Sequence, residues 1–107
     1  MFRIFVVLIL VGAPASAGFQ TGNSFYDKCS QNDDFDAMYC MGYSGAIADT
    51  LGTGAQAING FRACMPTGAS HNQVLAIVNN WLAQNPEKRH FTAASLVAAA
   101  LAEAFPC

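Results

Sequence analysis

Apolar and polar positions beyond residue 17 repeat mostly with helical spacing, and no segment shows the sustained alternation that is typical of a strand. The spacing predicts four helices, at about 24–29, from 33 or 34 to about 51, from 70 to 85, and from 92 to about 104. Capping signals support these ends: Asp33 or Asp34 for the second helix, the box Ser70-x-x-Gln73 for the third, and Thr92 for the fourth. The third helix ends at Asn85-Pro86, because the residue before a proline avoids α geometry.

Each of the three longer helices has one apolar face that predicts its core contacts. These faces contain Cys40, Tyr43, Ser44, Ile47 and Leu51 in the second helix, Val74, Leu75, Val78, Trp81 and Leu82 in the third, and Val97, Leu101 and Phe105 in the fourth. We expect Trp81 to anchor the core. The opposite sides contain Asn72, Asn79, Asn80 and Gln84, which we expect to face water, and Ser95, Ala99 and Glu103.

Small residues interrupt the second helix, and a short stretch of charges separates the third from the fourth. Gly42, Gly45 and Ala46 lie in mid-helix, where each glycine costs about 1 kcal/mol against alanine, so we expect a tight backbone crossing there. Residues 52–60 contain three glycines and predict a flexible connection. The charged residues 87–90 predict a solvated turn.

The first 17 residues have the features of a secretory signal peptide. Arg3 supplies the positive start, Ile4 to Val11 form an apolar stretch, and Ala15-Ser16-Ala17 is a small-residue cleavage site. Eight apolar residues are too few to span a bilayer, which needs roughly 20. We therefore expect a single domain at 18–107, exported to the periplasm and not held in the membrane.

The four cysteines all follow the predicted cleavage site, and an even number in a short exported chain indicates disulfides. Spacing favours Cys29 with Cys40 and Cys64 with Cys107, while the two other connectivities remain open. Each bridge is expected to contribute about 3 kcal/mol or more. Zinc is disfavoured because no two ligand residues have the required close spacing. The sequence thus predicts an all-α, four-helix domain stapled by two disulfides, with no metal.

Composition and charge exclude several functions. Of the chain's residues 53% are hydrophobic and 11% are charged, so a folded core is expected in place of disorder. Without Arg3, four basic residues stand against seven acidic ones, a net charge of −3 that argues against nucleic-acid binding.

Catalytic chemistry is also disfavoured. Disulfides would leave no cysteine nucleophile, and no serine nucleophile-elbow pattern occurs. Asp33, Asp34 and Asp36 are explained by helix capping, and Asp49 and His71 have no partner that spacing identifies. We expect neither enzymatic activity nor a cofactor.

Several ordered motifs resemble the Rap/Tai family of periplasmic immunity proteins. They are Cys40-Met41-Gly42-Tyr43-Ser44-Gly45-Ala46-Ile47-Ala48-Asp49, Cys64-Met65-Pro66, Gln73-Val74, Asn85-Pro86-Glu87, the alanine-rich stretch 94–100 and the closing Phe105-Pro106-Cys107. The resemblance covers residues 20–107. It implies an all-helical inhibitor of a papain-like peptidoglycan amidase toxin of type VI secretion, which acts by occupying the catalytic cleft and often as a homodimer. It also implies that the four cysteines form disulfides and that Gly42, Gly45 and Asp49 belong to the scaffold.

The partner-binding surface is predicted from residue types, because no family motif identifies it. The connection 52–62 is expected to be exposed, and we select Gln56, Asn59, Phe61 and Arg62 as partner-binding residues. Two alternatives remain, an acid-stress chaperone and a non-catalytic envelope adaptor. The chaperone is less favoured because few ionisable residues are present to drive an acid-induced change.

Overall fold

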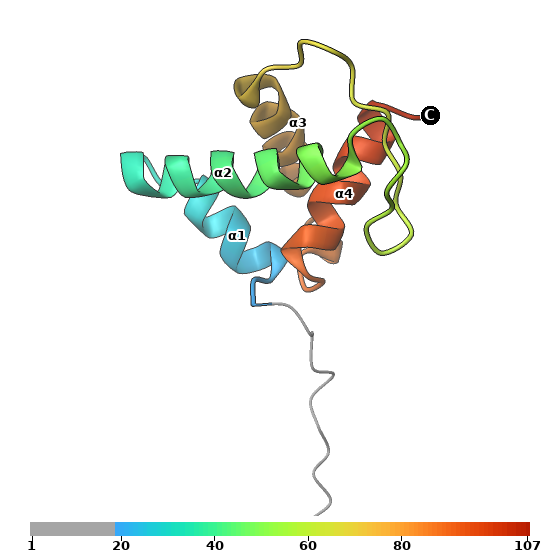
Figure 1. Cartoon of the computed structure of the whole chain (residues 1–107). Helices are drawn as coiled ribbons and strands as arrows, with labels where there is room; N and C mark the ends of the chain where they lie inside the picture. Colours follow the sequence, from blue (N-terminus) through green and yellow to red (C-terminus); the bar gives the residue numbers. More distant parts are fainter. Residues whose placement is uncertain (1–18) are drawn as a thin grey trace, which may run out of the picture.

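The computed structural model describes residues 19–107, in which all regular structure is helical. Its elements are α1 (Gly22–Cys29), α2 (Asp34–Leu51), α3 (His71–Gln84), the short 3₁₀ helix η1 (Pro86–Lys88) and α4 (Ala93–Ala104). Figure 1 shows α2 crossing α3 and α4, with α1 below it. The predicted signal peptide lies outside the described residues. Within them, no helix has the length and apolar character that a membrane span requires.

Local signals in the sequence explain most helix ends. The Asp33 side chain accepts a hydrogen bond from the Phe35 amide (3.1 Å), and the predicted box at Ser70 and Gln73 is present in both directions (3.1 and 2.8 Å). α1 begins two residues earlier than predicted, because Thr21 caps it. Thr92 occupies the N-cap of α4 as predicted, but its hydroxyl pairs with the Ser95 hydroxyl (2.8 Å) and caps no backbone amide.

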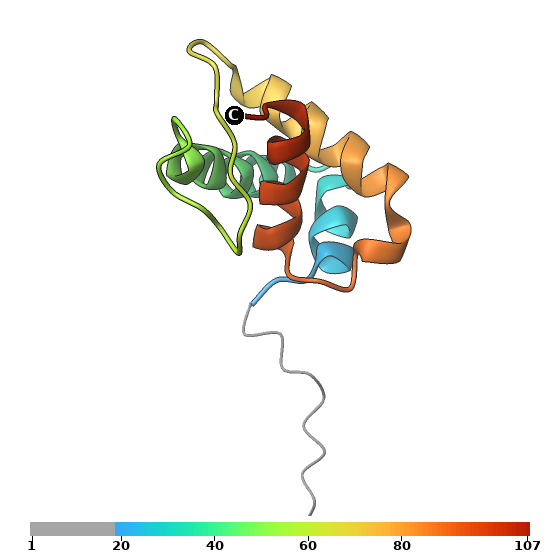
Figure 2. The same cartoon turned by 90° about the vertical axis from the view of Figure 1, so that its right-hand side faces the viewer.

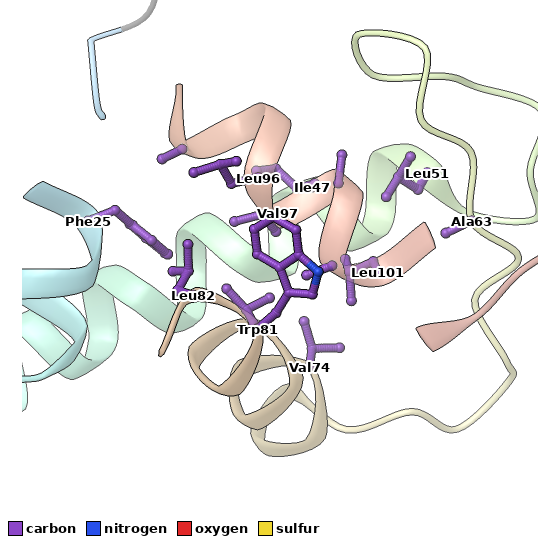
Figure 3. Packing of buried hydrophobic residues seen from close by; sticks show 14 of the residues in the cluster. Phe25, Ile47, Leu51, Ala63, Val74, Trp81, Leu82, Leu96, Val97 and Leu101 are labelled. Atoms are coloured by element: carbon purple, nitrogen blue, oxygen red, sulfur yellow. The ribbon is translucent and has the colours of Figure 1, made fainter. Parts of the chain in front are cut away.

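The core forms where side chains from all four helices meet (Figure 3). α4 is central, with half of its twelve residues buried, namely Ala93, Leu96, Val97, Ala98, Ala100 and Leu101. Its alanines make a thin helix, so α2 and α3 approach it closely. Complete burial of one of the larger apolar side chains contributes about 1.5–3 kcal/mol. The predicted apolar faces are confirmed, with Trp81 only 9% exposed.

Both predicted disulfides are confirmed. Cys29–Cys40 joins the end of α1 to α2, with the Cα atoms 5.6 Å apart, and Cys64–Cys107 joins the middle of the chain to its last residue, with the Cα atoms 5.0 Å apart.

Two expectations about polar residues need correction. The Asn79 side-chain oxygen is buried instead of facing water. Arg89 is not in a solvated turn, since its Nε donates to the Leu82 carbonyl (2.8 Å) and its guanidinium lies 4.0 Å from the Tyr26 ring centre.

The predicted tight backbone crossing at the α2 glycines is wrong. A Cβ on Gly42 would have no neighbour within 4 Å, and one on Gly45 would meet only the side chain of His71. The close backbone approach lies at Gly22, where a Cβ would be 2.7 Å from the Arg89 carbonyl oxygen and would also strike Leu96. Here the start of α1 pairs with the turn before α4, as the Gly22 amide donates to the Phe91 carbonyl (2.8 Å).

Gly22 and Gly42 give a matched pair of substitutions with opposite expected effects. Gly22→Ala should lower the free energy of unfolding by about 1–3 kcal/mol, because backbone must move to admit the methyl group. Gly42→Ala should raise it by about 1 kcal/mol, because an open helical site gains helix propensity. Urea unfolding followed by circular dichroism measures both. Equal effects at the two positions would contradict the packing described for Gly22.

Tyr43 gives the stability a dependence on alkaline pH. Burial raises the pKa of its phenol above 10.0, and Tyr39 acts in the same direction, while a backbone hydrogen bond with Ala94 opposes them. Because the folded pKa exceeds the unfolded one, the contribution of Tyr43 should be complete below pH 10 and lost as the pH rises through the folded value. Urea midpoints measured from pH 8 to 11 should therefore fall less steeply in Tyr43→Phe than in the unaltered protein. Parallel curves would refute this assignment.

Candidate protein-binding site

The connection after α2 forms a tight hairpin at its tip. The amides of Ile58 and Phe61 each donate to the other residue's carbonyl, at 3.0 and 2.9 Å. Between them, Asn59 and Gly60 have φ angles of 48° and 86°, the left-handed geometry for which Asn-Gly is the favoured pair in a two-residue turn. The exposed loop predicted at 52–62 is thus a hairpin with a defined tip.

One contact closes the hairpin connection on itself, and two others attach it to the rest of the fold. The Arg62 guanidinium donates to the carbonyls of Gly54 (2.7 Å) and Ala55 (3.3 Å), which closes the loop on itself. Gly54 lies against the Cys64–Cys107 bridge, where a Cβ would be 2.7 Å from the Cys107 Sγ. The Asn59 side-chain amide donates to the Ser95 hydroxyl of α4. Figure 2 shows the connection running alongside α4.

A groove of about 1120 Å³ lies between this hairpin and the turn that leads into α4. Its surface is mostly apolar. The lining residues are Asn59 and Phe61 from the hairpin, Trp81 from α3, Lys88, His90, Phe91 and Thr92 from the turn, and Ser95, Leu96, Ala99, Ala102 and Glu103 from α4. We call it the hairpin groove.

The small side chains of α4 give the hairpin groove its depth, and aromatic rings flank them. Phe61 is 39% exposed and Phe91 53% exposed, so both rings are available to a partner. Charges of both signs lie beside Trp81. The Trp81 indole N–H donates to the Glu103 carboxylate (2.8 Å), and the Lys88 ammonium lies 5.5 Å from the Trp81 ring centre. An apolar groove with a few placed polar groups is suited to binding a partner's side chains.

The structure brings together only half of the predicted partner-binding residues. Asn59 and Phe61 line the hairpin groove, whereas Gln56 and Arg62 do not. Arg62 instead holds its own loop. Lys88, Phe91 and Trp81 also line the groove, although none of them was predicted as a partner-binding residue. The sequence pattern indicated only one part of the groove. It placed Ser95, Ala99 and Glu103 on the side of α4 opposite the core face.

All four cysteines are held in disulfides, so none is a free thiol. Within residues 19–107, no cluster of three or more His, Cys, Asp or Glu side chains could hold a metal ion.

The model of the family described as Rap1a immunity proteins matches residues 21–107. The chain belongs to this family. The match includes all four helices, both disulfides and every residue of the hairpin groove. No curated protein and no solved structure matches the chain. Membership of the Rap1a immunity family identifies the chain as an immunity protein. The partner expected of such a protein is a toxin, and the family suggests a non-catalytic, inhibitory role.

Removal of the Cys64–Cys107 bridge should loosen the hairpin as well as destabilise the fold. For Cys64→Ala with Cys107→Ala, we expect a loss of about 4 kcal/mol from the longer closed loop and faster hydrogen exchange at the Ile58 and Phe61 amides. Cys29→Ala with Cys40→Ala is the control, with an expected loss of about 3 kcal/mol. Hairpin amides that exchange equally fast in both variants would show that the bridge does not hold the hairpin.

Proposed function

We propose that this protein is a periplasmic immunity protein that neutralises a peptidoglycan amidase toxin of type VI secretion. It would act by placing the hairpin and its groove against the toxin and occluding the catalytic cleft. The observation that carries this proposal is membership of the Rap1a immunity family over residues 21–107. The predicted signal peptide and the two disulfides support the periplasm as the compartment, since disulfides persist in oxidising environments.

The rigidity of the hairpin supports its role in inhibition. Binding costs less free energy when the contacting loop is already ordered. The hairpin has its own backbone hydrogen bonds, the internal bonds of Arg62, and a link to α4 through Asn59. It therefore presents Phe61 in one position, and a partly exposed aromatic ring is a typical interface anchor.

The hairpin groove supports a two-sided contact. A protruding hairpin can enter a concave site on the toxin while the groove beside it receives an apolar side chain from the rim of that site. Lys88 and Glu103 offer both charges beside Trp81 in the groove lining, which would fix the register of a bound segment. The mature net charge of −3 would favour association with a basic toxin. Homodimer formation, which the family resemblance implies, remains a prediction.

The proposal is tested by growth of cells that receive a candidate amidase toxin in the periplasm. Co-expression of the unaltered protein should restore growth. Phe61→Asp should abolish protection and weaken toxin binding by at least about tenfold, because it puts a charge on the expected anchor.

Ala83→Asp is the control, since it adds the same charge at an exposed position of α3 outside the groove. It should protect as well as the unaltered protein does. Killing by every candidate amidase, with or without the protein, would refute the amidase immunity role. Full protection by Phe61→Asp would refute the role of the hairpin alone.

A further inference from the structure

The two disulfides differ in how accessible their sulfur atoms are. Cys107 is exposed and Cys64 is half-buried. In the other bridge, Cys40 is completely buried and Cys29 packs against the core. Figures 1 and 2 both show the chain end marked C at the surface, beside the connection between α2 and α3. A reductant can therefore reach Cys64–Cys107 while the helical body is intact, whereas core packing shields Cys29–Cys40.

Exposure also determines which sulfur atom is attacked. In thiol–disulfide exchange a thiolate attacks one sulfur of the bridge, and the other sulfur leaves as a thiolate. Attack at the exposed Cys107 expels Cys64. The Cys64 sulfur lies 3.3 Å from the Thr53 carbonyl oxygen, which can accept a hydrogen bond from the thiol once it is protonated. Arg62 binds the carbonyl of Gly54, which lies against both sulfur atoms, and a positive charge in this neighbourhood favours a thiolate leaving group.

The hairpin responds to the state of this bridge because its base packs on the sulfur atoms. A Cβ built on Gly54 would lie 2.7 Å from the Cys107 Sγ and 2.9 Å from the Cys64 Sγ. Two thiol sulfurs cannot remain at bonding distance, so cleavage moves at least one of them. The Gly54 carbonyl also accepts the hydrogen bond from Arg62 that closes the connection (2.7 Å). A displacement at Gly54 therefore acts directly on the contact that holds the hairpin closed.

Other contacts hold the helical body when this bridge is open. The buried core draws side chains from all four helices, and Cys29–Cys40 still joins α1 to α2. The Cys64 amide donates to the Phe105 carbonyl (2.9 Å), which keeps the connection near the end of α4. We therefore expect cleavage of Cys64–Cys107 to lower stability and loosen the hairpin, but to preserve the helices.

We propose that Cys64–Cys107 is a redox switch for the hairpin, opened by a protein dithiol of the Cys-x-x-Cys type. One thiolate of the reductant attacks the Cys107 sulfur and forms a mixed disulfide, while Cys64 leaves with the electron pair and takes up a proton. The second thiol of the reductant loses its proton and attacks its own mixed-disulfide sulfur. Cys107 leaves and is protonated, and the reductant becomes an internal disulfide. Two electrons and two protons thus pass to the protein, and the reverse exchange with an oxidised partner closes the bridge again.

This inference rests on the proposed function and adds regulation to it. Only the closed hairpin presents Phe61 in one position, and an ordered loop binds at a lower cost in free energy than a loose one. The protein would therefore bind its toxin tightly where disulfides persist and weakly where reduced dithiols prevail.

Reduced thioredoxin, a Cys-x-x-Cys dithiol, is the probe for the full protein. Alkylation followed by mass spectrometry should find Cys64 and Cys107 opened at thioredoxin concentrations at least tenfold lower than those that open Cys29–Cys40. With Cys64–Cys107 alone open, exchange of the Ile58 and Phe61 amides should be at least tenfold faster, with helicity retained by circular dichroism. The Kd for an amidase that the protein neutralises, inactivated at its catalytic cysteine, should rise at least tenfold and recover on reoxidation.

Two double variants are matched controls for the effect of thioredoxin. Cys64→Ala with Cys107→Ala has no bridge at the hairpin, so its hairpin exchange should not change when thioredoxin is added. Cys29→Ala with Cys40→Ala retains the proposed switch and should respond as the unaltered protein does.

The outcomes separate the switch from the immunity role. Equal reduction of both bridges, loss of helicity when only Cys64–Cys107 opens, or unchanged exchange of the hairpin amides would each overturn the switch, and none of these measurements involves a toxin. A Kd that stays the same after reduction overturns the regulation and leaves the immunity role intact. If the protein neutralises no amidase, the proposed function fails, while the reduction and exchange measurements still decide the switch. Selective reduction with faster hairpin exchange and a reversible rise in Kd supports the inference.

Discussion

The Cys64–Cys107 bridge is the constraint on which the candidate site depends. It joins the last residue to the middle of a chain whose core is small, where one covalent link is comparable in size to the net stability of the domain. Backbone hydrogen bonds reinforce the same junction, from the Cys64 amide to the Phe105 carbonyl and from the Met65 amide to the Gly52 carbonyl, each 2.9 Å. The base of the hairpin is therefore attached to the end of α4, and Gly54 is the residue small enough to lie against the sulfur atoms.

The composition of α4 explains how one helix can serve the core and the site together. Its inward alanines permit close packing of α2 and α3, and its outward Ala99 and Ala102 leave space that becomes the hairpin groove. Larger residues at these two positions, which also contact the core, would fill this space. The groove is thus a consequence of a thin helix flanked by two bulky neighbours, the hairpin and the turn that carries Phe91.

The fold was largely predictable from the sequence because its determinants are local. Caps such as Ser70 with Gln73 and the four-residue repeat of apolar positions act within one helix, and cysteine spacing favoured the correct pairs.

The site was only half predictable because its contacts join distant parts of the chain. The pair Asn59 and Ser95 is separated by 36 residues, and the pair Trp81 and Glu103 by 22. Gly22 was missed for the same reason, since only the paired α1 start and α4 turn make its lack of a side chain necessary.

The distribution of charge distinguishes residues that serve the fold from those available to a partner. Arg62 and Arg89 direct their guanidinium groups to backbone carbonyls of the same chain, so half of the four basic residues in the predicted mature protein are used internally. The acids at the start of α2 remain exposed in its first turn, where the helix dipole stabilises them at little cost. In complex formation with a basic toxin, as proposed, these exposed acids would speed encounter, while exposed apolar side chains such as Phe35 and Phe61 would determine how long the complex lasts.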